Sequence, residues 1–364
     1  MIRSIVVVAG GTGGHVMPAL ALARHLYAQG QKIIFYTDPR GVQYLSPSQE
    51  PFDIVVMPLQ SRQNVLKFIF SIGQCCYQAL KHILKDRLLG VISFGGYSAF
   101  AWGLMAGLYS VPLMLHEQNA LRGRTNRILA FWAQHVALTF KSKSSKRNWL
   151  SKIYRPETVT GLPLRSEFTA QNYQLPQSGQ PFQLLVIGGS QGAKFLNEVV
   201  PQAILLLSED LRQHIKVEQQ CASDQIENVQ KIYDQAQVTV SLKPFFDPLA
   251  QYMTEAHLII ARAGASTLAE IATIGRPAIL VPYPYAQDDH QTINAKVFTE
   301  HHRGWFFDQK SLTFEKLANF LENILKNPQL LLSVVEAGRD QSHGQATKML
   351  SSLVLKNFLP EREK

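Results

Sequence analysis

Short apolar runs alternate with longer amphipathic stretches along most of this chain. Residues 4–11 form a continuous β-branched run that ends in glycine, which is typical of a buried strand. Residues 19–30 have apolar side chains at helical spacing and stop at Gly30, and residues 31–38 return to a strand pattern. Strand, helix and strand in this order predict a parallel, doubly wound sheet. Further strands are predicted at 53–59, 90–96, 111–119 and 135–140.

The same pattern restarts near residue 182. Residues 182–200 repeat the opening layout of apolar strand, two glycines, a small polar residue, glycine and helix. More strands are predicted at 215–221, 237–242, 256–264 and 277–284. The polar stretch 169–181 has no periodicity and is interpreted as a linker or surface loop. We therefore predict an α/β protein of two Rossmann-like, doubly wound domains facing a cleft, with ligands at the C-terminal edges of the strands.

Size and charge narrow the class of protein. A chain of 364 residues exceeds the range in which one hydrophobic core keeps growing, which favours two domains over one. The formal net charge of +9 favours an anionic partner: nucleic acid, an acidic membrane surface or a phosphorylated substrate. The three cysteines form no disulfide framework, which favours a reducing, cytosolic compartment. The first apolar run is too short for a signal peptide, and no stretch reaches the roughly 20 apolar residues of a spanning helix.

The first predicted strand and helix are joined by a glycine loop. It consists of Gly10, Gly11, Thr12, Gly13 and Gly14. Backbone amides in such a loop can bind phosphate at the positive end of the following helix. The dinucleotide fingerprint does not fit, because its third glycine position falls on Val16. Two alternatives stay open: a tight turn that only packs the helix, and a nicotinamide-type site in which Asp38 binds a ribose.

His15 follows this loop in the first turn of the predicted helix. The helix dipole disfavours the imidazolium there, so a neutral ring can accept a proton. We expect His15 to act as a general base. The alternative is a structural hydrogen bond.

The second domain contains two further candidate loops. Residues 188–194 resemble the first loop, with Ser190 in its polar position. After the strand near residue 260, Arg262 precedes a predicted helix start at Ser266 and Thr267, whose amides and hydroxyls suit a diphosphate. Glu270 can accept hydrogen bonds from a ribose diol. Alternatively, Ser266 or Thr267 is a plain N-cap and Glu270 completes a capping box.

Residues 281–295 place two prolines and then a dense polar cluster after a predicted strand. Its members are Asp288, Asp289, His290, Gln291 and Asn294. Short side chains that mix donors and acceptors suit the hydroxyls of a sugar. The adjacent aspartates are interpreted as loop or helix-start residues, because neighbouring side chains rarely converge on a metal ion without further ligands.

Eight short segments together resemble a known family. They are GGTGGH (10–15), GGY (95–97), HEQNA (116–120), GLPLR (161–165), GGSQGA (188–193), FF (245–246), RAGASTLAE (262–270) and DHQTINA (289–295). In this order they resemble the GT-B glycosyltransferases, and more narrowly the family that adds N-acetylglucosamine to undecaprenyl-diphosphate-linked muramoyl pentapeptide. The resemblance implies an acceptor domain at 1–163, to which a C-terminal helix at 341–364 returns, and a UDP-sugar domain at 164–340.

The resemblance also implies roles for individual residues. Donor-binding residues would be Thr12, Gly13, Gly14, Asn119, Arg165, Ser190, Phe246, Arg262, Ala265, Ser266, Thr267, Leu268, Ala269, Glu270 and Gln291. Among them, Phe246 would lie near the uracil, Glu270 would hold the ribose, and the helix start at 265–268 would hold the diphosphate. The acceptor region would include Gly11, His15 and Tyr97. His15 is the leading candidate for the base, and Glu117 is the alternative.

The implied reaction is an inverting transfer from UDP-N-acetylglucosamine to the C4 hydroxyl of N-acetylmuramic acid on its lipid diphosphate. UDP-N-acetylglucosamine is a substrate, and neither a cofactor nor a metal ion is required. Two departures from the family are His290, where a glutamine is common, and the bulky residues after Tyr97. The competing functions are a diacylglycerol glycosyltransferase, a dehydrogenase and a non-catalytic, membrane-surface nucleotide-binding protein.

A polyprenyl acceptor implies contact with the cytoplasmic face of the bacterial inner membrane. Residues 64–90 mix apolar side chains, including Leu66, Phe68, Ile69 and Phe70, with lysines and an arginine, which suits an anionic bilayer surface. An ordinary amphipathic helix packed on the sheet is the alternative. The basic stretch 141–155 is a second candidate patch, or a solvated loop. No nucleic-acid-binding signature accompanies these charges, so nucleic acid is not expected as a partner.

Overall fold

A computed structural model gives the fold of the protein. It describes residues 3–60, 63–140, 155–177, 179–188, 194–338 and 343–359. The chain divides into two compact units. Unit 1 comprises Met1–Ser166 and Ser342–Lys364, and unit 2 comprises Glu167–Gln341. Each unit is built on its own parallel sheet.

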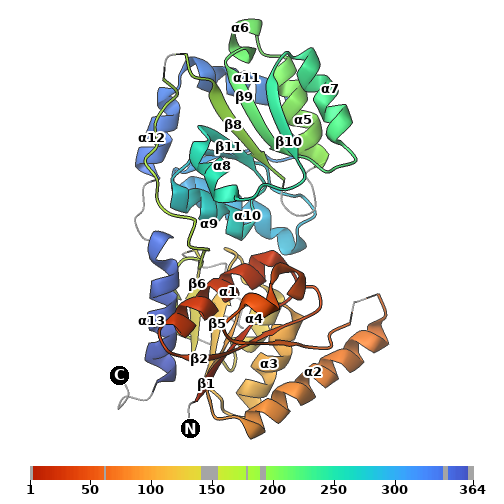
Figure 1. Cartoon of the computed structure of the whole chain (residues 1–364), viewed down its shortest axis with the longest axis vertical. Helices are drawn as coiled ribbons and strands as arrows, with labels where there is room; N and C mark the ends of the chain where they lie inside the picture. The colour runs from red at the N-terminus through yellow and green to blue at the C-terminus, as the bar shows by residue number, and fades with distance from the viewer. Residues whose placement is uncertain are drawn as a thin grey trace. The chain divides into compact units, whose positions relative to one another are not determined.

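Unit 1 contains, among its described residues, a seven-stranded parallel sheet of order β3-β2-β1-β4-β5-β6-β7 (Figure 1). Its strands are β1 (Ser4–Val8), β2 (Lys32–Thr37), β3 (Asp53–Val56), β4 (Leu88–Ser93), β5 (Leu113–Glu117), β6 (His135–Leu138) and β7 (Glu157–Val159). The strand order reverses between β1 and β4, so the loops after these two strands flank the switch point at which such folds bind ligands.

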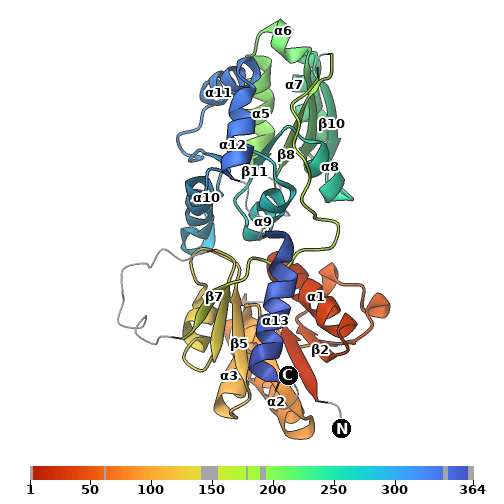
Figure 2. The ribbon, with the colours of Figure 1, turned by 90° about the vertical axis from the view of Figure 1, so that its left-hand side faces the viewer.

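The central strand β1 is buried on both faces, as its uninterrupted apolar run predicts. Because successive side chains alternate between the faces, Ile5 and Val7 pack in one core and Val6 and Val8 in the other. The helices of this unit are α1 (Gly13–Ala28), α2 (Val65–Lys85), α3 (Tyr97–Leu108), α4 (Arg124–Leu129) and α13 (Ala346–Phe358). Helix α13 packs against α1 and β4, and both views draw it beside α1 (Figures 1 and 2).

Helix α1 starts six residues earlier than its apolar spacing predicts. It begins at Gly13 with the extended Thr12 as N-cap, and it ends at Ala28. Gly13 and Gly14 carry no side chain, so a periodic pattern of apolar residues cannot reveal that they are helical. His15 therefore lies in the first turn, as predicted.

Unit 2 contains, in the part that the structure describes, a six-stranded parallel sheet of order β10-β9-β8-β11-β12-β13. Its strands are β8 (Phe182–Ile187), β9 (Ile215–Gln220), β10 (Thr239–Lys243), β11 (Leu258–Ala261), β12 (Ala278–Leu280) and β13 (Gly304–Phe306). The helices are α5 (Lys194–Leu205), α6 (Glu209–Arg212), α7 (Ile226–Gln235), α8 (Leu249–Glu255), α9 (Ala265–Ile274), α10 (His290–Glu300), α11 (Phe314–Lys326) and α12 (Gln329–Ala337). The predicted class of two doubly wound α/β domains is confirmed.

Two strands have no counterpart in the sequence prediction. They are β7 and β13, each three residues long and each at the edge of its sheet. Neither is fully buried, so neither shows the continuous apolar run that identified the central strands. No helix in the described part of the chain is long and apolar enough to cross a membrane.

Candidate functional site

The glycine loop of unit 1 packs tightly against the loop that follows β4. A Cβ atom on Gly10 would lie 2.0 Å from Ser98 Oγ and 2.4 Å from Asp38 Oδ2, so only glycine fits there. Gly95 and Gly96 both have positive φ, and Gly96 is the N-cap of α3. The segments GGTGGH and GGY are therefore brought together at the C-terminal ends of two neighbouring strands, β1 and β4.

The side chain of Asp38 stabilises the glycine loop through hydrogen bonds to backbone amides. Its side chain is 1% exposed, and Oδ1 accepts hydrogen bonds from the backbone amides of Gly11 at 3.2 Å, Arg40 at 3.1 Å and Gly41 at 2.9 Å. A carboxylate that is buried and engaged in this way cannot bind the diol of a ribose. The alternative of a nicotinamide-type site, which depended on Asp38, is therefore not supported.

The ring of His15 lies between the two loops of unit 1. Its Nδ1 is 3.3 Å from Thr12 Oγ1, and a Cβ on Gly95 would lie 3.3 to 3.4 Å from Cδ2 and Nε2 of the ring. In the tautomer with its proton on Nδ1, His15 donates to Thr12 and keeps the lone pair of Nε2. Tyr97 begins α3 at the same edge of the sheet, and its ring packs edge-on against Phe68 at 5.2 Å.

Glu117 ends β5 and is 3% exposed. Its carboxylate accepts hydrogen bonds from Asn119 N at 3.1 Å, Gly123 N at 2.9 Å and Asn126 Nδ2 at 2.9 Å. Burial raises the pKa of this carboxyl, whereas the three hydrogen bonds and Arg122 oppose the rise. With both oxygens engaged, Glu117 fixes the loop that carries Asn119.

His116, beside Glu117 in the sequence, is fully buried. Its Nε2 lies 3.0 Å from the carbonyl oxygen of Gly161, and its ring stacks on Phe94 at 4.9 Å. Burial lowers the pKa of His116 to about 4, so the ring is neutral at physiological pH and serves packing. Gly161 opens the segment GLPLR, in which Arg165 is partly exposed.

In unit 2, α9 starts directly after β11 with Gly264 as its N-cap and no side-chain capping bond. Ser266 and Thr267 are therefore the second and third residues of the helix. This excludes the alternative in which one of them is a plain N-cap and Glu270 completes a capping box. Leu268 N already donates to Gly264 O at 3.0 Å, so the amides of Ala265, Ser266 and Thr267 are the ones that helix geometry leaves for a ligand.

The side chains of this helix start divide into two kinds. Ala265, Leu268 and Ala269 are buried, so any contact that Ala265 makes with a ligand comes from its backbone. Ser266 Oγ is shielded from solvent and has no hydrogen-bond partner among the described residues. An unpaired buried hydroxyl costs about 1–3 kcal/mol, which a hydrogen bond from this hydroxyl to a ligand oxygen would recover. Glu270 lies one turn further along, partly exposed.

Arg262 is 8% exposed and lies at the end of β11. Its Nη1 donates to the carbonyls of Val281 at 2.9 Å and Pro282 at 3.1 Å, and its guanidinium lies 5.6 Å from the Tyr283 ring centroid. Burial lowers the pKa of Arg262 to about 10, which leaves it charged at pH 7. The two carbonyls fix a cation next to the helix start, with further N–H groups to donate.

The polar cluster after β12 forms a short 3₁₀ turn (Gln287–Asp289) and the start of α10. Asp289 is the N-cap of α10, which agrees with its interpretation as a helix-start residue. Gln291 Oε1 accepts from Tyr283 N at 2.9 Å, and His290 Nδ1 lies 2.7 Å from the carbonyl of Gln287. Asn294, fully buried, donates to Ala263 O at 3.1 Å and so ties α10 to the loop before α9.

Phe246 is the buried member of its pair. It is 3% exposed and packs on Tyr252 at 4.6 Å, whereas the neighbouring Phe245 is 71% exposed. A nucleobase in this region can therefore contact the ring of Phe245 and the backbone of Phe246. Ser190 and the rest of the predicted loop at 189–193 lie outside the described residues.

Gln220, the last residue of β9, was not singled out from the sequence. Its Oε1 accepts from Gly188 N at 3.2 Å, and its Nε2 donates to Pro244 O at 3.1 Å. It therefore joins the loop after β8 to the loop that carries Phe245 and Phe246. A polar residue at the C-terminal end of a predicted strand is the signal that identifies it.

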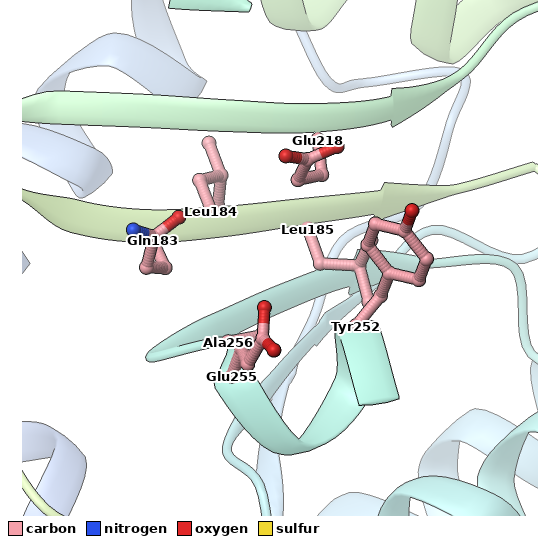
Figure 3. Close-up of a pocket in the computed structure, with 7 residues that line it drawn as sticks. All are labelled: Gln183, Leu184, Leu185, Glu218, Tyr252, Glu255 and Ala256. Carbon is pink, nitrogen blue, oxygen red and sulfur yellow. The ribbon is translucent and has the colours of Figure 1, made fainter. Parts of the chain in front are cut away.

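Two cavities in the described part of unit 2 do not coincide with these residues. One, bounded by β8, β9 and α8, measures about 10 Å³, room for a single water molecule (Figure 3). A groove of about 430 Å³ between α5 and α7 is lined mainly by amide and charged side chains, among them Asn197 and Gln225. Neither contains a residue predicted for the site.

Comparisons with known proteins agree with the two-unit architecture. A family model described as "Glycosyltransferase family 28 N-terminal domain" matches residues 5–138, and "Glycosyltransferase family 28 C-terminal domain" matches 183–348. A relative from Paramagnetospirillum magneticum is 38% identical over 96% of this chain and 96% of its own length. Another from Rhodospirillum rubrum is 37% identical over 96% of this chain and 91% of its own length.

Both relatives are named UDP-N-acetylglucosamine–N-acetylmuramyl-(pentapeptide) pyrophosphoryl-undecaprenol N-acetylglucosamine transferase. Among solved structures, MurG of Acinetobacter baumannii superposes with a TM-score of 0.80 at 31% identity, covering 98% of this chain and all of the other. The likeness extends over both units.

Proposed function

The chain belongs to glycosyltransferase family 28, and on that premise we infer that it transfers N-acetylglucosamine from UDP-N-acetylglucosamine to the muramoyl pentapeptide carried on undecaprenyl diphosphate. The observation that carries this inference is the end-to-end similarity to transferases named for this reaction. The reaction is an inverting displacement. The C4 hydroxyl oxygen loses its proton and bonds to the anomeric carbon of the donor, and the bond between that carbon and UDP breaks.

The first unit contributes the glycine loop (residues 10–14), which borders the sugar acceptor, and the general base. His15 takes the proton of the C4 hydroxyl at Nε2, while Thr12 holds the proton on Nδ1. Glu117 is a positioning residue, because its oxygens are occupied by three donors and it holds Asn119 near the sugar. Gly11 and Tyr97 border the acceptor. The donor-binding residues proposed for this unit are Thr12, Gly13, Gly14, Asn119 and Arg165.

The second unit holds the nucleotide. The diphosphate lies on the amides of Ala265, Ser266 and Thr267, with the charge of Arg262 beside it to stabilise departing UDP. Glu270 accepts from the ribose, and Gln291 donates to the sugar through its amide nitrogen, since its oxygen is bonded to Tyr283 N. Phe245 and the Phe246 backbone border the uracil, and Ser190 completes the donor set.

A transfer assay tests the function as a whole. Radiolabelled N-acetylglucosamine should move from its UDP donor to a short-chain analogue of the lipid acceptor. The assay should run with UDP-glucose and diacylglycerol in parallel. Transfer of glucose to diacylglycerol with no product on the muramoyl acceptor would overturn the assignment.

Replacing Ser266 by alanine should separate ligand binding from folding. Because the hydroxyl has no partner in the described structure, we expect the free energy of unfolding to stay constant or rise by about 1 kcal/mol. We propose that a phosphate oxygen of bound UDP accepts a hydrogen bond from this hydroxyl, so the variant should bind UDP about tenfold more weakly. Calorimetric titration with UDP and thermal unfolding measure the two effects.

Ser71→Ala is the matched control for this substitution. Ser71 Oγ donates to Phe68 O at 2.7 Å and accepts from Gln60 N at 3.1 Å, so its loss should lower stability and leave UDP binding unchanged. If Ser266→Ala destabilises the protein as Ser71→Ala does and binds UDP normally, Ser266 is structural.

We further propose that α2 binds the cytoplasmic face of the bacterial inner membrane. The predicted segment forms a single helix whose inner face packs on α3 through buried residues such as Cys75 and Ala79. The outer face exposes apolar side chains, namely Val65 (65%), Leu66 (81%), Ile69 (60%), Phe70 (68%), Tyr77 (71%) and Leu84 (71%). Lys67, Lys81 and Lys85 are exposed beside them. This combination suits an anionic bilayer.

Replacing Leu66 and Phe70 together by glutamine should weaken binding to vesicles that contain anionic lipid by about a hundredfold. Each side chain contributes about 1.5–3 kcal/mol when it leaves water, so even partial insertion gives an effect of this size. Phe68→Leu is a control, because Phe68 packs inward against Tyr97. Sedimentation with vesicles measures the binding. Unchanged binding of the double variant would place the membrane contact elsewhere. Residues 141–154 of the second basic patch lie outside the described residues.

A further inference from the structure

A cationic side chain that was not among the site residues predicted from the sequence, Arg40, lies beside the glycine loop of unit 1. Arg40 follows β2, and its Nη2 is 3.5 Å from the position that a Cβ on Gly11 would occupy. The guanidinium therefore faces the outer side of the turn that precedes α1. The side chain is 60% exposed, so a ligand at this turn can reach it.

The surroundings of Arg40 fix its backbone and leave its side chain available. Its backbone amide donates to Asp38 Oδ1 at 3.1 Å, which holds the start of the 38–44 segment. Its guanidinium lies 3.8 Å from Asp38 Oδ2, too long for a hydrogen bond. In the described part of the chain the side chain of Arg40 has no hydrogen-bonding partner, so its N–H groups can donate to a ligand.

Tyr44, from the same 38–44 segment as Arg40, also contacts the glycine loop. Its Cε1 is 3.2 Å from the position of a Cβ on Gly13, so the 38–44 segment borders the glycine loop at two points. Asp38 pairs with Arg40 at 3.8 Å, but its carboxylate is buried and accepts three backbone amides on its other oxygen. The guanidinium is therefore the exposed group of the pair. The exposed charge beside Gly11 is thus positive.

We propose that Arg40 binds the diphosphate of the lipid acceptor. This proposal rests on the function proposed above, which places an acceptor with a diphosphate at this loop. A planar guanidinium donates two parallel hydrogen bonds to phosphate oxygens, and such charge-assisted bonds are stronger than neutral ones. Arg40 thereby sets affinity for the acceptor and leaves the donor untouched.

Steady-state kinetics with a water-soluble, short-chain acceptor and no membrane tests this role. Arg40→Ala should raise the acceptor KM ten- to a hundredfold and leave the KM for UDP-N-acetylglucosamine within twofold. Arg40→Lys should recover part of the loss, because it keeps the charge but not the paired donors. Arg24→Ala is the matched control, since Arg24 is an exposed arginine of the same unit whose Nε donates to Glu50 at 2.9 Å.

A second acceptor that carries a single phosphate identifies the group that is bound. With it, the gap between wild type and Arg40→Ala should shrink at least threefold. An unchanged acceptor KM, an equal rise in the donor KM, or a loss seen only with vesicles would each overturn the proposal; the last result would assign Arg40 to a lipid headgroup. If the wild-type chain itself transfers no sugar, the proposed function fails instead.

Discussion

Replacing His15 by alanine should lower kcat by about 10²–10⁴-fold, the loss expected when a general base is removed. The affinity for UDP should change little, because the residues proposed for its uracil, ribose and diphosphate belong to unit 2. The wild-type kcat should fall at acidic pH as the base becomes protonated, and the variant should lose this dependence. Single-turnover transfer measured across pH 5 to 9 checks both expectations.

His25→Ala is a control for this substitution on the same helix. His25 lies in the last turn of α1, ten residues and about 15 Å further along the axis, and should leave kcat unchanged. Near-normal turnover of His15→Ala, with UDP binding intact, would show that another group takes the proton. Thr12→Ala should give a smaller loss than His15→Ala, since Thr12 orients the ring but does not itself take the proton.

Replacing Glu117 by alanine should cost about 3 kcal/mol in free energy of unfolding. Three donors, Asn119 N, Gly123 N and Asn126 Nδ2, would lose their acceptor in a buried site. The loop that carries Asn119 would shift, so the KM for the sugar donor should rise as well. Chemical denaturation and steady-state kinetics measure these effects.

Glu117→Gln distinguishes the positioning role from the role of a base. The amide can still accept from Asn119, but its NH₂ group faces other donors, so we expect an intermediate loss of stability. The shape of the pH profile should persist, because His15 is intact. A kcat reduced by 10² or more, at full stability and with the acid limb lost, would make Glu117 the base. Glu157→Ala, an exposed glutamate paired with Arg122, should change stability by no more than about 0.5 kcal/mol.

Much of the fold follows from local patterns. The uninterrupted run of β1 predicts a strand buried on both faces, and the restart at residue 182 predicts the second sheet. The segment after β11 also predicts a helix start near Ser266. Its capping was not predictable, because Gly264 is an N-cap that acts through its backbone alone and leaves no side-chain signal.

The candidate site depends more heavily on contacts between distant residues. Asp38 suited a ribose as judged from its place after a strand, yet it binds the amide of Gly11, which is 27 residues away. Phe68 and Phe70 look equivalent in the sequence, but one packs on Tyr97 and the other is exposed. Arg40 lies beside Gly11 because β2 is next to β1 in the sheet.

The sequence alone thus determined the fold class, the family and the position of His15 in the first turn of a helix. These properties depend on the periodicity of apolar residues and on short motifs, both of which are local along the chain. Only the tertiary structure decided that Asp38 and Glu117 are buried carboxylates that hold neighbouring loops through hydrogen bonds. It also decided that Ser266 has an unpaired hydroxyl and that Arg40 borders the glycine loop. The physical reason is that hydrogen-bond partners and exposure depend on which loops the strand order places side by side.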